Sequence, residues 1–377
     1  MNTRIMLKTI GAYGVILLTM SNATVTYAFP GDATVEFQPV DSNRIPEILN
    51  MISTTMRTNY NRIKTWRGEV RLSIDRINDG AAAEQIFKKN THTKGEIPAV
   101  VLKHEEPTIE FALNAENDLL FVNQYPGKPR QYIDFETKRD LGAKWMPDHS
   151  KAIVTPEYYL HSSPNIIREK VVLKRKAVKT KRKKGRSSCG GSVPPIYEPR
   201  DSFGARRTIL ETFPLLLQHI NEHGELNVDG HRLKVEEQKD GDVTRYLVRQ
   251  PAKIAPETYR FLKMVFCSEN GFNIVSYELA DSNGKLLRRL TWAYELVSGV
   301  YLPQKTTEER FERTNGGLSY YIEGTFRNLQ INQPIPEETF SYKNLGLKNG
   351  DKFIDKIGGK EYTYQDEKLI EVEKSNK

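Results

Sequence analysis

The segment of this sequence closest to a catalytic motif is His219-Ile220-Asn221-Glu222-His223. In an H-x-x-E-H pattern, two imidazoles one helical turn apart bind zinc, and the glutamate activates a water molecule. The context disfavours this chemistry, because Gly224 ends the predicted helix directly after the motif and no helix-borne acid downstream offers a third protein ligand. Histidine is also favoured at a helix C-terminus by the helix dipole alone. We therefore favour a solvated helix end, with a zinc peptidase as a remote alternative.

No other pattern in the sequence points to an enzyme or a cofactor. The sequence has no G-x-S-x-G nucleophile elbow, no Gly-rich phosphate loop followed by Lys and Ser or Thr, and no dinucleotide-binding fingerprint after a strand. Aspartate and glutamate are plentiful, but they are scattered over the outward positions of predicted strands. We expect a non-enzymatic protein without catalytic residues, metal or cofactor.

The two cysteines, Cys189 and Cys267, are too few for a disulfide-built scaffold or a zinc knuckle. The core must therefore be held together by packing. Cys267 ends an apolar strand-like run, which favours a buried free thiol, although an oxidising compartment would allow a bridge to Cys189.

An amphipathic helix followed by an alternating strand opens the body of the chain. Asp41-Ser42-Asn43 offers capping side chains, Pro46 suits a first helical turn, and apolar residues recur at spacings of three and four up to Ile63. From Trp66 to Asp75 every even position is apolar or Gly and every odd position is polar. This alternation predicts a strand with one buried and one solvated face, on which the helix packs.

The same alternation continues through most of the chain and predicts an antiparallel meander. Short strands are expected within 109–113, 118–122 and 131–135. Turn residues then separate longer expected strands at 231–237, 243–249, 272–280, 285–296, 300–312 and 318–331. In the run 285–296, one face is expected to carry Leu286, Leu290, Trp292, Tyr294 and Leu296.

A second helix is predicted over residues 202–223. The expected fold class is α+β. We predict a half-open antiparallel β-barrel, formed by a curved meander sheet, with the helices packed in its concave face.

The composition is that of a globular protein with one unusual segment. The 377 residues are 38% hydrophobic and 28% charged, which excludes disorder throughout, collagen and a multi-span membrane protein. The formal charge is +8, but residues 168–186 alone hold eleven bases and one acid. Because the rest of the chain is slightly acidic, nucleic acid is not an expected partner.

The basic segment runs into residues 174–196, which are rich in Gly, Ser and Pro and lack apolar periodicity. We expect a disordered loop inserted between two halves of one sheet. The loop 168–186 is suited to contact an anionic membrane surface, and a solubilising insertion is the simpler alternative.

The first 28 residues have the pattern of an export signal. A mostly apolar run from Thr9 to Met20 follows two basic residues, and the small residues Thr26 and Ala28 form a cleavage site. The run is too short to cross a bilayer, which disfavours an uncleaved anchor. We expect a mature protein that begins near Phe29 and lies outside the cytoplasm.

Several segments, in their order along the chain, resemble one known family. The segments that carry the likeness are residues 60–68 at the end of the first helix, Tyr197-Glu198-Pro199-Arg200, Trp292-Ala293-Tyr294, Gly299-Val300-Tyr301-Leu302-Pro303 and residues 332–340. Together they resemble the exported proteins of the outer-membrane lipoprotein carrier and sorting (LolA-like) superfamily of Gram-negative bacteria. The likeness covers most of the mature chain.

The resemblance implies a half-open barrel with helices lying as a lid in its concave side. It further implies a monomeric periplasmic protein that binds lipid or lipoprotein acyl chains in an apolar cavity, as in lipoprotein sorting between envelope membranes. Burial of acyl chains gains roughly 0.8 kcal/mol per CH₂ and needs no catalytic group. Residues 29–342 would form the carrier-like domain, and residues 343–377 an added C-terminal hairpin.

The cavity would be lined by the apolar face of the first strand and of the meander. The candidate ligand-binding residues are Val70, Leu72, Ile74, Leu262, Met264, Phe266, Leu290, Trp292 and Tyr294. A one-residue shift of a strand's register would exchange its two faces. A second hypothesis is an envelope sensor or scaffold of the same fold that recognises a protein segment. An open cavity would favour the carrier, and a plugged one the scaffold.

Overall fold

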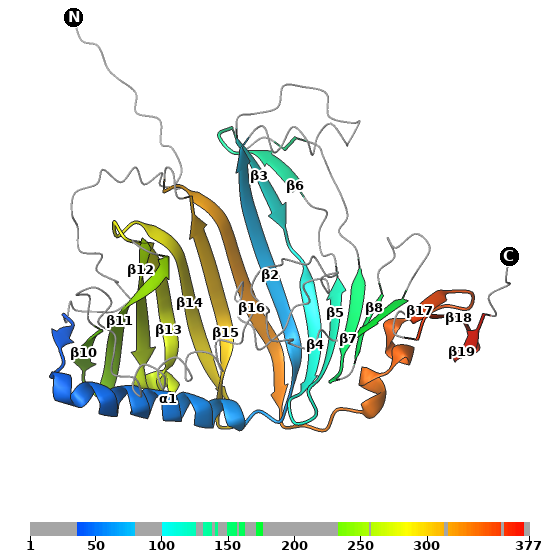
Figure 1. Ribbon diagram of the computed structural model, residues 1–377, viewed down its shortest axis with the longest axis horizontal. Helices are drawn as coiled ribbons and strands as arrows, with labels where there is room; N and C mark the ends of the chain where they lie inside the picture. Colours follow the sequence, from blue (N-terminus) through cyan, green and yellow to red (C-terminus); the bar gives the residue numbers. More distant parts are fainter. Residues whose placement is uncertain are drawn as a thin grey trace, which may run out of the picture. The chain divides into compact units, whose positions relative to one another are not determined.

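A computed structural model shows the chain built around one large, mostly antiparallel sheet (Figure 1). Residues Phe37–Lys377 form one compact unit. The structure describes residues 36–79, 100–125, 131–137, 140–141, 149–156, 158–162, 171–175, 233–255, 258–312, 316–355 and 358–372.

Within these described ranges the elements are one α-helix, four short 3-10 helices and strands of very different length. The long strands are β2 (Thr65–Asp79), β11 (Val243–Ala255), β12 (Thr258–Cys267), β13 (Asn273–Asp281), β14 (Leu286–Val297), β15 (Val300–Phe311) and β16 (Leu318–Ile331). The shorter strands are β1 (Gln38–Pro39), β3 (Val100–Glu105), β4 (Thr108–Asn114), β5 (Leu119–Tyr125), β6 (Gln131–Asp134), β7 (Ser150–Val154), β8 (Tyr158–Ser162), β9 (Val171–Arg175), β10 (Lys234–Asp240), β17 (Lys352–Asp355), β18 (Lys360–Gln365) and β19 (Lys368–Glu371). The helical elements are η1 (Ser42–Arg44), α1 (Ile45–Asn61), η2 (Ser268–Asn270), η3 (Glu337–Phe340) and η4 (Tyr342–Leu345).

The strand order follows from the hydrogen-bonded pairs. It runs β1, β10, β11, β12, β13, β14, β15, β16, β2, β4, β5, β7, β8, β9, β17, β18, β19. Strand β3 pairs with β2 beyond the end of β4, and β6 pairs with β3. All of these pairings are antiparallel except that of β9 with β17. Within the described residues the sheet is not closed, so the antiparallel meander is confirmed and the barrel stays a prediction.

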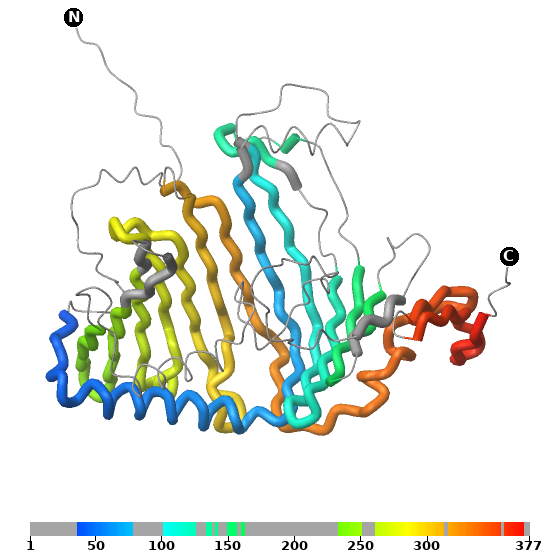
Figure 2. Tube along the Cα trace, in the orientation of Figure 1, coloured from blue at the N-terminus to red at the C-terminus, as the bar shows by residue number. Residues whose placement is uncertain are grey.

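Strands β2 and β16 join the two halves of the sheet. They are far apart in the sequence but lie side by side, coloured blue to cyan and orange in Figure 2. Strands β4 to β9 lie on the far side of β2, followed by β17 to β19, and strands β10 to β15 lie beyond β16, with β1 at their outer edge.

Helix α1 forms where the sequence predicts it. Asp41 Oδ1 accepts a hydrogen bond of 2.9 Å from the backbone N–H of Asn43 in the short 3-10 turn η1, and Pro46 lies in the first turn of α1. The buried side of α1 carries Ile48, Leu49, Ile52 and Met56. These side chains pack with buried residues of β10 to β14, and we call the face of the sheet that they cover the helix face.

The helix face can be traced across the sheet, because directly opposed residues on neighbouring strands point to the same side. Leu72 of β2 lies opposite Gly324, which lies opposite Thr306, which in turn lies opposite Trp292 of the cluster that packs on α1. The predicted alternation in β2 is therefore correct: its even positions are buried on the helix face, and Arg71 lies on the opposite, outer face.

Some expectations need correction and others lie outside the described residues. Leu296 is 57% exposed, and it lies beyond a bulge at Gln304 of β15, where the pairing with β14 shifts by one residue. Lys174 and Arg175, the first two residues of the predicted insertion, belong to β9, and residues 176–196 lie outside the described residues. The second predicted helix, the motif His219 to His223, Cys189 and most of the basic segment lie outside the described residues.

Strands β17 and β18 pair in antiparallel fashion within the expected C-terminal extension. The domain boundary at residue 342 stays a prediction.

Cys267 is a buried free thiol, and burial raises its pKa. In the described part of the chain, no helix has the length and apolar character that crossing a membrane requires.

Asn59 provides a direct test of how α1 is held on the sheet. Its Nδ2 donates to the carbonyl of Tyr301 at 3.0 Å and its Oδ1 accepts from the N–H of Tyr301 at 2.8 Å. We expect Asn59→Ala to lower the free energy of unfolding by about 1–3 kcal/mol, because two backbone groups lose their partner. Urea denaturation measures this difference.

The control for this test is Asn50→Ala, at an exposed position of the same helix. It should change the free energy of unfolding by less than about 0.5 kcal/mol. Similar effects of the two substitutions would show that Asn59 does not anchor the helix.

Candidate functional site

The predicted cavity residues lie in the sheet as their alternation requires, but most are already packed. Seven of the nine are buried. Met264, Phe266, Leu290 and Trp292 belong to the cluster that packs against α1. The remaining buried residues are Val70, Leu72 and Ile74, in a second cluster with side chains of β4, β5, β15 and β16. Helix α1 thus occupies much of the surface that the sequence assigns to a ligand.

Two of the nine predicted residues, Leu262 and Tyr294, are only half-buried. Tyr294 lies opposite Pro303, next to the bulge in β15, and packs against apolar clusters on both faces of the sheet. Its hydroxyl donates to the carbonyl of Ile274 at 2.8 Å, and burial raises its pKa. This hydrogen bond ties Tyr294 to the protein, so Leu262 is the better candidate for a ligand contact.

Leu262 is part of a half-buried patch on the helix face. Leu262 lies opposite Leu279, and Tyr277 lies one step along β13 on the same face. We call Leu262, Tyr277 and Leu279 the apolar strip. In this strip, neighbouring apolar side chains remain partly open to solvent next to the cluster under α1.

A group of charged residues continues the same row of the helix face. Leu279 lies opposite Arg288, Arg288 opposite Arg310, Arg310 opposite Tyr320, and Tyr320 opposite Arg76. One step along β15, Glu308 lies between Leu290 and Ile322. We call Arg76, Arg288, Glu308, Arg310 and Tyr320 the arginine cluster.

Glu308 is the centre of the arginine cluster. Its side chain is 0% exposed, and its Oε1 lies 2.8 Å from Nε of Arg288 and 2.5 Å from Nε of Arg310. The side chains of Arg288 and Arg310 are 22% and 45% exposed. The Glu308 carboxylate therefore positions two guanidiniums at the boundary between the core and solvent.

The ring of Tyr320 holds the third guanidinium near the other two. The Cζ atoms of Arg76 and Arg310 lie 5.4 and 4.8 Å from its centroid, within the range of cation–π contacts. Burial raises the pKa of Tyr320, and the two guanidiniums act against that rise. Tyr320 therefore stays protonated and keeps a hydroxyl donor beside the guanidiniums.

The sequence analysis missed this cluster. It placed acidic residues on outward strand positions, which is wrong for Glu308, because Glu308 is fully buried on the helix face. The sequence did contain a signal: Arg288 is two and four residues from Leu290 and Trp292, so in a strand it lies on the same face as these apolar residues.

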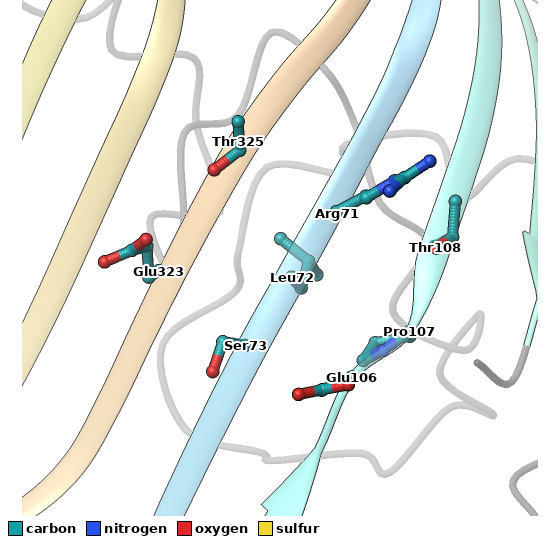
Figure 3. A pocket seen from close by; sticks show the side chains of 8 residues that line it. All are labelled: Arg71, Leu72, Ser73, Glu106, Pro107, Thr108, Glu323 and Thr325. Atoms are coloured by element: carbon teal, nitrogen blue, oxygen red, sulfur yellow. The ribbon is translucent and has the colours of Figure 1, made fainter. Parts of the chain in front are cut away.

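The outer face carries a different, polar site where β3 passes into β4. A cavity of about 360 Å³ lies there between β2, β16 and the link between β3 and β4 (Figure 3). Its lining residues are Arg71, Leu72, Ser73, Glu106, Pro107, Thr108, Glu323 and Thr325. Leu72, predicted as a ligand contact, is among the lining residues of this cavity, although its side chain lies on the helix face.

His104 lies beside this cavity and is held by two carboxylates. Its Nδ1 is 2.6 Å from Oδ1 of Asp75 and its Nε2 is 3.2 Å from Oε1 of Glu106. The hydrogen bond to Asp75 raises the pKa of His104, burial opposes this, and Glu106 adds to the rise. Because both ring nitrogens contact carboxylates, neither is available to activate the nearby Ser73. The geometry is that of a charged clamp between β2 and β3.

Metal chemistry finds no support in the described residues, which contain no group of three or more His, Cys, Asp or Glu side chains arranged to hold an ion. The predicted zinc motif at His219 to His223 lies outside them.

Comparisons with known proteins give distant structural similarities only. No family model and no curated protein matches the chain. A DUF1329 family protein from Desulfovibrio piger is 10% identical over 79% of this chain and 98% of its own, with a TM-score of 0.36. A LolA superfamily protein from Nitrosomonas europaea is 9% identical over 81% of this chain and 100% of its own, with a TM-score of 0.34.

A third similar structure is a domain from Vibrio parahaemolyticus described as an outer membrane lipoprotein-sorting protein. It is 10% identical over 78% of this chain and 97% of its own, with a TM-score of 0.35. Two of the three structures thus carry names from the superfamily that the sequence resembles. Because similarity at this level says nothing of a ligand, we base the function on residues of this chain.

The His104 clamp makes a prediction about pH. Because its pKa is raised in the folded state, His104 contributes its full stabilisation below its ordinary value of 6.5 and loses it as pH rises through the folded-state pKa. The difference in free energy of unfolding between the wild type and His104→Gln should therefore shrink as pH rises. Denaturant titrations between about pH 5 and pH 8 measure it.

His149→Gln is the opposite case. Burial and Lys151 lower the pKa of His149, so its contribution is present at higher pH and is lost as pH falls through 6.5. The difference from the wild type should therefore grow with rising pH. If the difference in free energy of unfolding from the wild type changed with pH in the same direction for both variants, the assigned contacts would be wrong.

Proposed function

We propose that this protein is exported to the periplasm and binds the acyl chains of a lipid or lipoprotein on the helix face of its sheet, without catalysing a reaction. The observation that carries the proposal is the apolar strip. Leu262, Tyr277 and Leu279 remain partly exposed on a face whose neighbouring apolar residues are buried.

The physical argument rests on the cost of leaving apolar side chains in water. Each CH₂ removed from water contributes roughly 0.8 kcal/mol, so an acyl chain laid along the strip gains affinity without any placed polar group. The buried cluster under α1 supports the strip from one side. A rigid, partly exposed apolar surface next to a packed core is suited to a hydrocarbon chain.

Localisation is supported by the export-signal pattern of the first 28 residues. The sequence resemblance to the lipoprotein carrier superfamily suggests the acyl chains of lipoproteins as a cargo class. The absence of a catalytic role is supported by the geometry of His104, whose two nitrogens are engaged by Asp75 and Glu106.

One observation favours the scaffold alternative. Met264, Phe266, Leu290 and Trp292 are buried against α1, so the part of the helix face that they form is already filled. A protein that recognises a peptide segment would need no further opening of this face. Binding of acyl chains is the property that separates the two functions.

The acyl-chain proposal is tested by placing a charge in the apolar strip. We expect Leu262→Asp to weaken binding of a fluorescent fatty acyl probe by about tenfold or more, because the probe chain would have to desolvate a carboxylate. Fluorescence titration of the mature protein measures the dissociation constant. Native mass spectrometry of the protein from the envelope fraction shows whether an acyl lipid co-purifies with it.

The matched control is Leu296→Asp, at an exposed leucine of β14. It should bind the probe like the wild type. If Leu262→Asp bound the acyl probe with wild-type affinity, the apolar strip would not be part of the binding site. A wild-type protein that carries no lipid and binds no acyl probe would overturn the carrier and favour the scaffold.

A further inference from the structure

We propose that the arginine cluster binds the anionic head group of an amphiphile whose hydrocarbon chain lies on the apolar strip. The inference rests on the proposed acyl-chain function and adds the chemistry of the other end of the ligand. That end is a carboxylate or a phosphate.

The first argument is continuity along one row of the helix face. Leu279 of the apolar strip is the direct cross-strand partner of Arg288, and Leu262 is the partner of Leu279. Neighbouring strands lie about 4.8 Å apart, so Leu262 is about 10 Å from Arg288 across the sheet. A ligand with its head at Arg288 would therefore pass directly onto the strip.

The second argument is charge. Among the described residues of this row and the next, the helix face carries four cationic side chains and two acidic ones, a net charge of +2. They are Arg76, Lys103, Arg288, Arg310, Glu105 and Glu308. Lys103 and Glu105 pair with each other at 2.5 Å, Glu308 contacts Arg288 and Arg310, and Arg76 lies at the ring of Tyr320.

Excess positive charge beside apolar side chains favours an anionic ligand. Arg288, with 22% of its side chain exposed, is largely withdrawn from water, and Glu308 is shared between two guanidiniums. A carboxylate or phosphate would add negative charge beside the guanidiniums of Arg76 and Arg310 through charge-assisted hydrogen bonds. An uncharged polar head group would leave the imbalance in place.

The third argument is that the cluster is ordered before a ligand arrives. Glu308 contacts Nε of Arg288 and of Arg310, and each guanidinium has a further four N–H groups on its two terminal nitrogens. The ring of Tyr320 holds Arg76 and Arg310 on the same side of the sheet. Because these side chains are already positioned, little conformational entropy is lost on binding.

The test compares a long-chain fatty acid with the fatty alcohol of the same length. At neutral pH the two ligands share their chain and differ in head-group charge. We expect the wild-type protein to bind the acid roughly tenfold or more tightly than the alcohol. In Arg310→Gln and in Arg76→Gln this preference should fall by about tenfold, while affinity for the alcohol stays unchanged.

The matched control is Arg249→Gln. Arg249 is 41% exposed, close to the 45% of Arg310, and pairs with Glu236 on the outer face. It should keep the wild-type preference for the acid. An equal loss in Arg249→Gln would show that the preference reflects overall charge and would overturn the assignment.

The outcomes separate the head-group inference from the proposed function. Equal affinity of the wild type for acid and alcohol would overturn the head-group site and leave the acyl-chain function standing. Failure of both ligands to bind would overturn the proposed function and, with it, the inference.

Two further ligands identify the anion. An alkyl phosphate with the same chain that binds more tightly than the fatty acid, and loses affinity in Arg310→Gln, would support a phosphate head group. Inorganic phosphate should compete only weakly with either. If it competes as well as the alkyl phosphate, the cluster is a site for small anions, and the amphiphile inference is wrong.

Discussion

The pairing of β2 with β16 is the interaction on which the rest of this structure depends. It joins two segments that lie more than two hundred residues apart in the sequence, and it places Ile322 opposite Ile74 and Phe326 opposite Val70. Trp66 at the start of β2 packs between the strands on either side: its ring is stacked on Phe326 and edge-on to Phe111, with ring centroids 6.2 and 5.2 Å apart. Because this register fixes which residues of both halves share a face, it also determines where the arginine cluster forms.

Local alternation in the sequence was sufficient to predict much of the fold. In β2 the side-chain period of two is unbroken, so Val70, Leu72 and Ile74 could be assigned to one buried face without knowledge of their partners. Helix α1 was equally readable, since its apolar spacing and its capping residues agree. Prediction failed at Leu296, which lies beyond the bulge at Gln304 of β15, because the sequence of β14 alone does not show this change of register.

The candidate site was less predictable than the fold, because it depends on pairings between distant segments. Arg76 and Tyr320 are neighbours only through the β2 and β16 register, and Glu308 meets Arg288 only across β14 and β15. A sequence pattern can show that Arg288 interrupts an apolar row, but it cannot show that Glu308 lies beside it. The general rule that charged strand residues face solvent fails for Glu308, because guanidiniums pair with its buried carboxylate.

The position of α1 has a consequence for how a ligand would reach the helix face. Asn59 and Arg62 fix the C-terminal end of the helix to the start of β15, through Tyr301 and Gly299. Arg310 is nine residues further along the same strand, which at about 3.3 Å per residue is about 30 Å away. The charged end of the site is thus remote from the point where the helix is anchored. An amphiphile can therefore engage the arginine cluster first and lay its chain toward the packed cluster, with no need for α1 to leave the sheet.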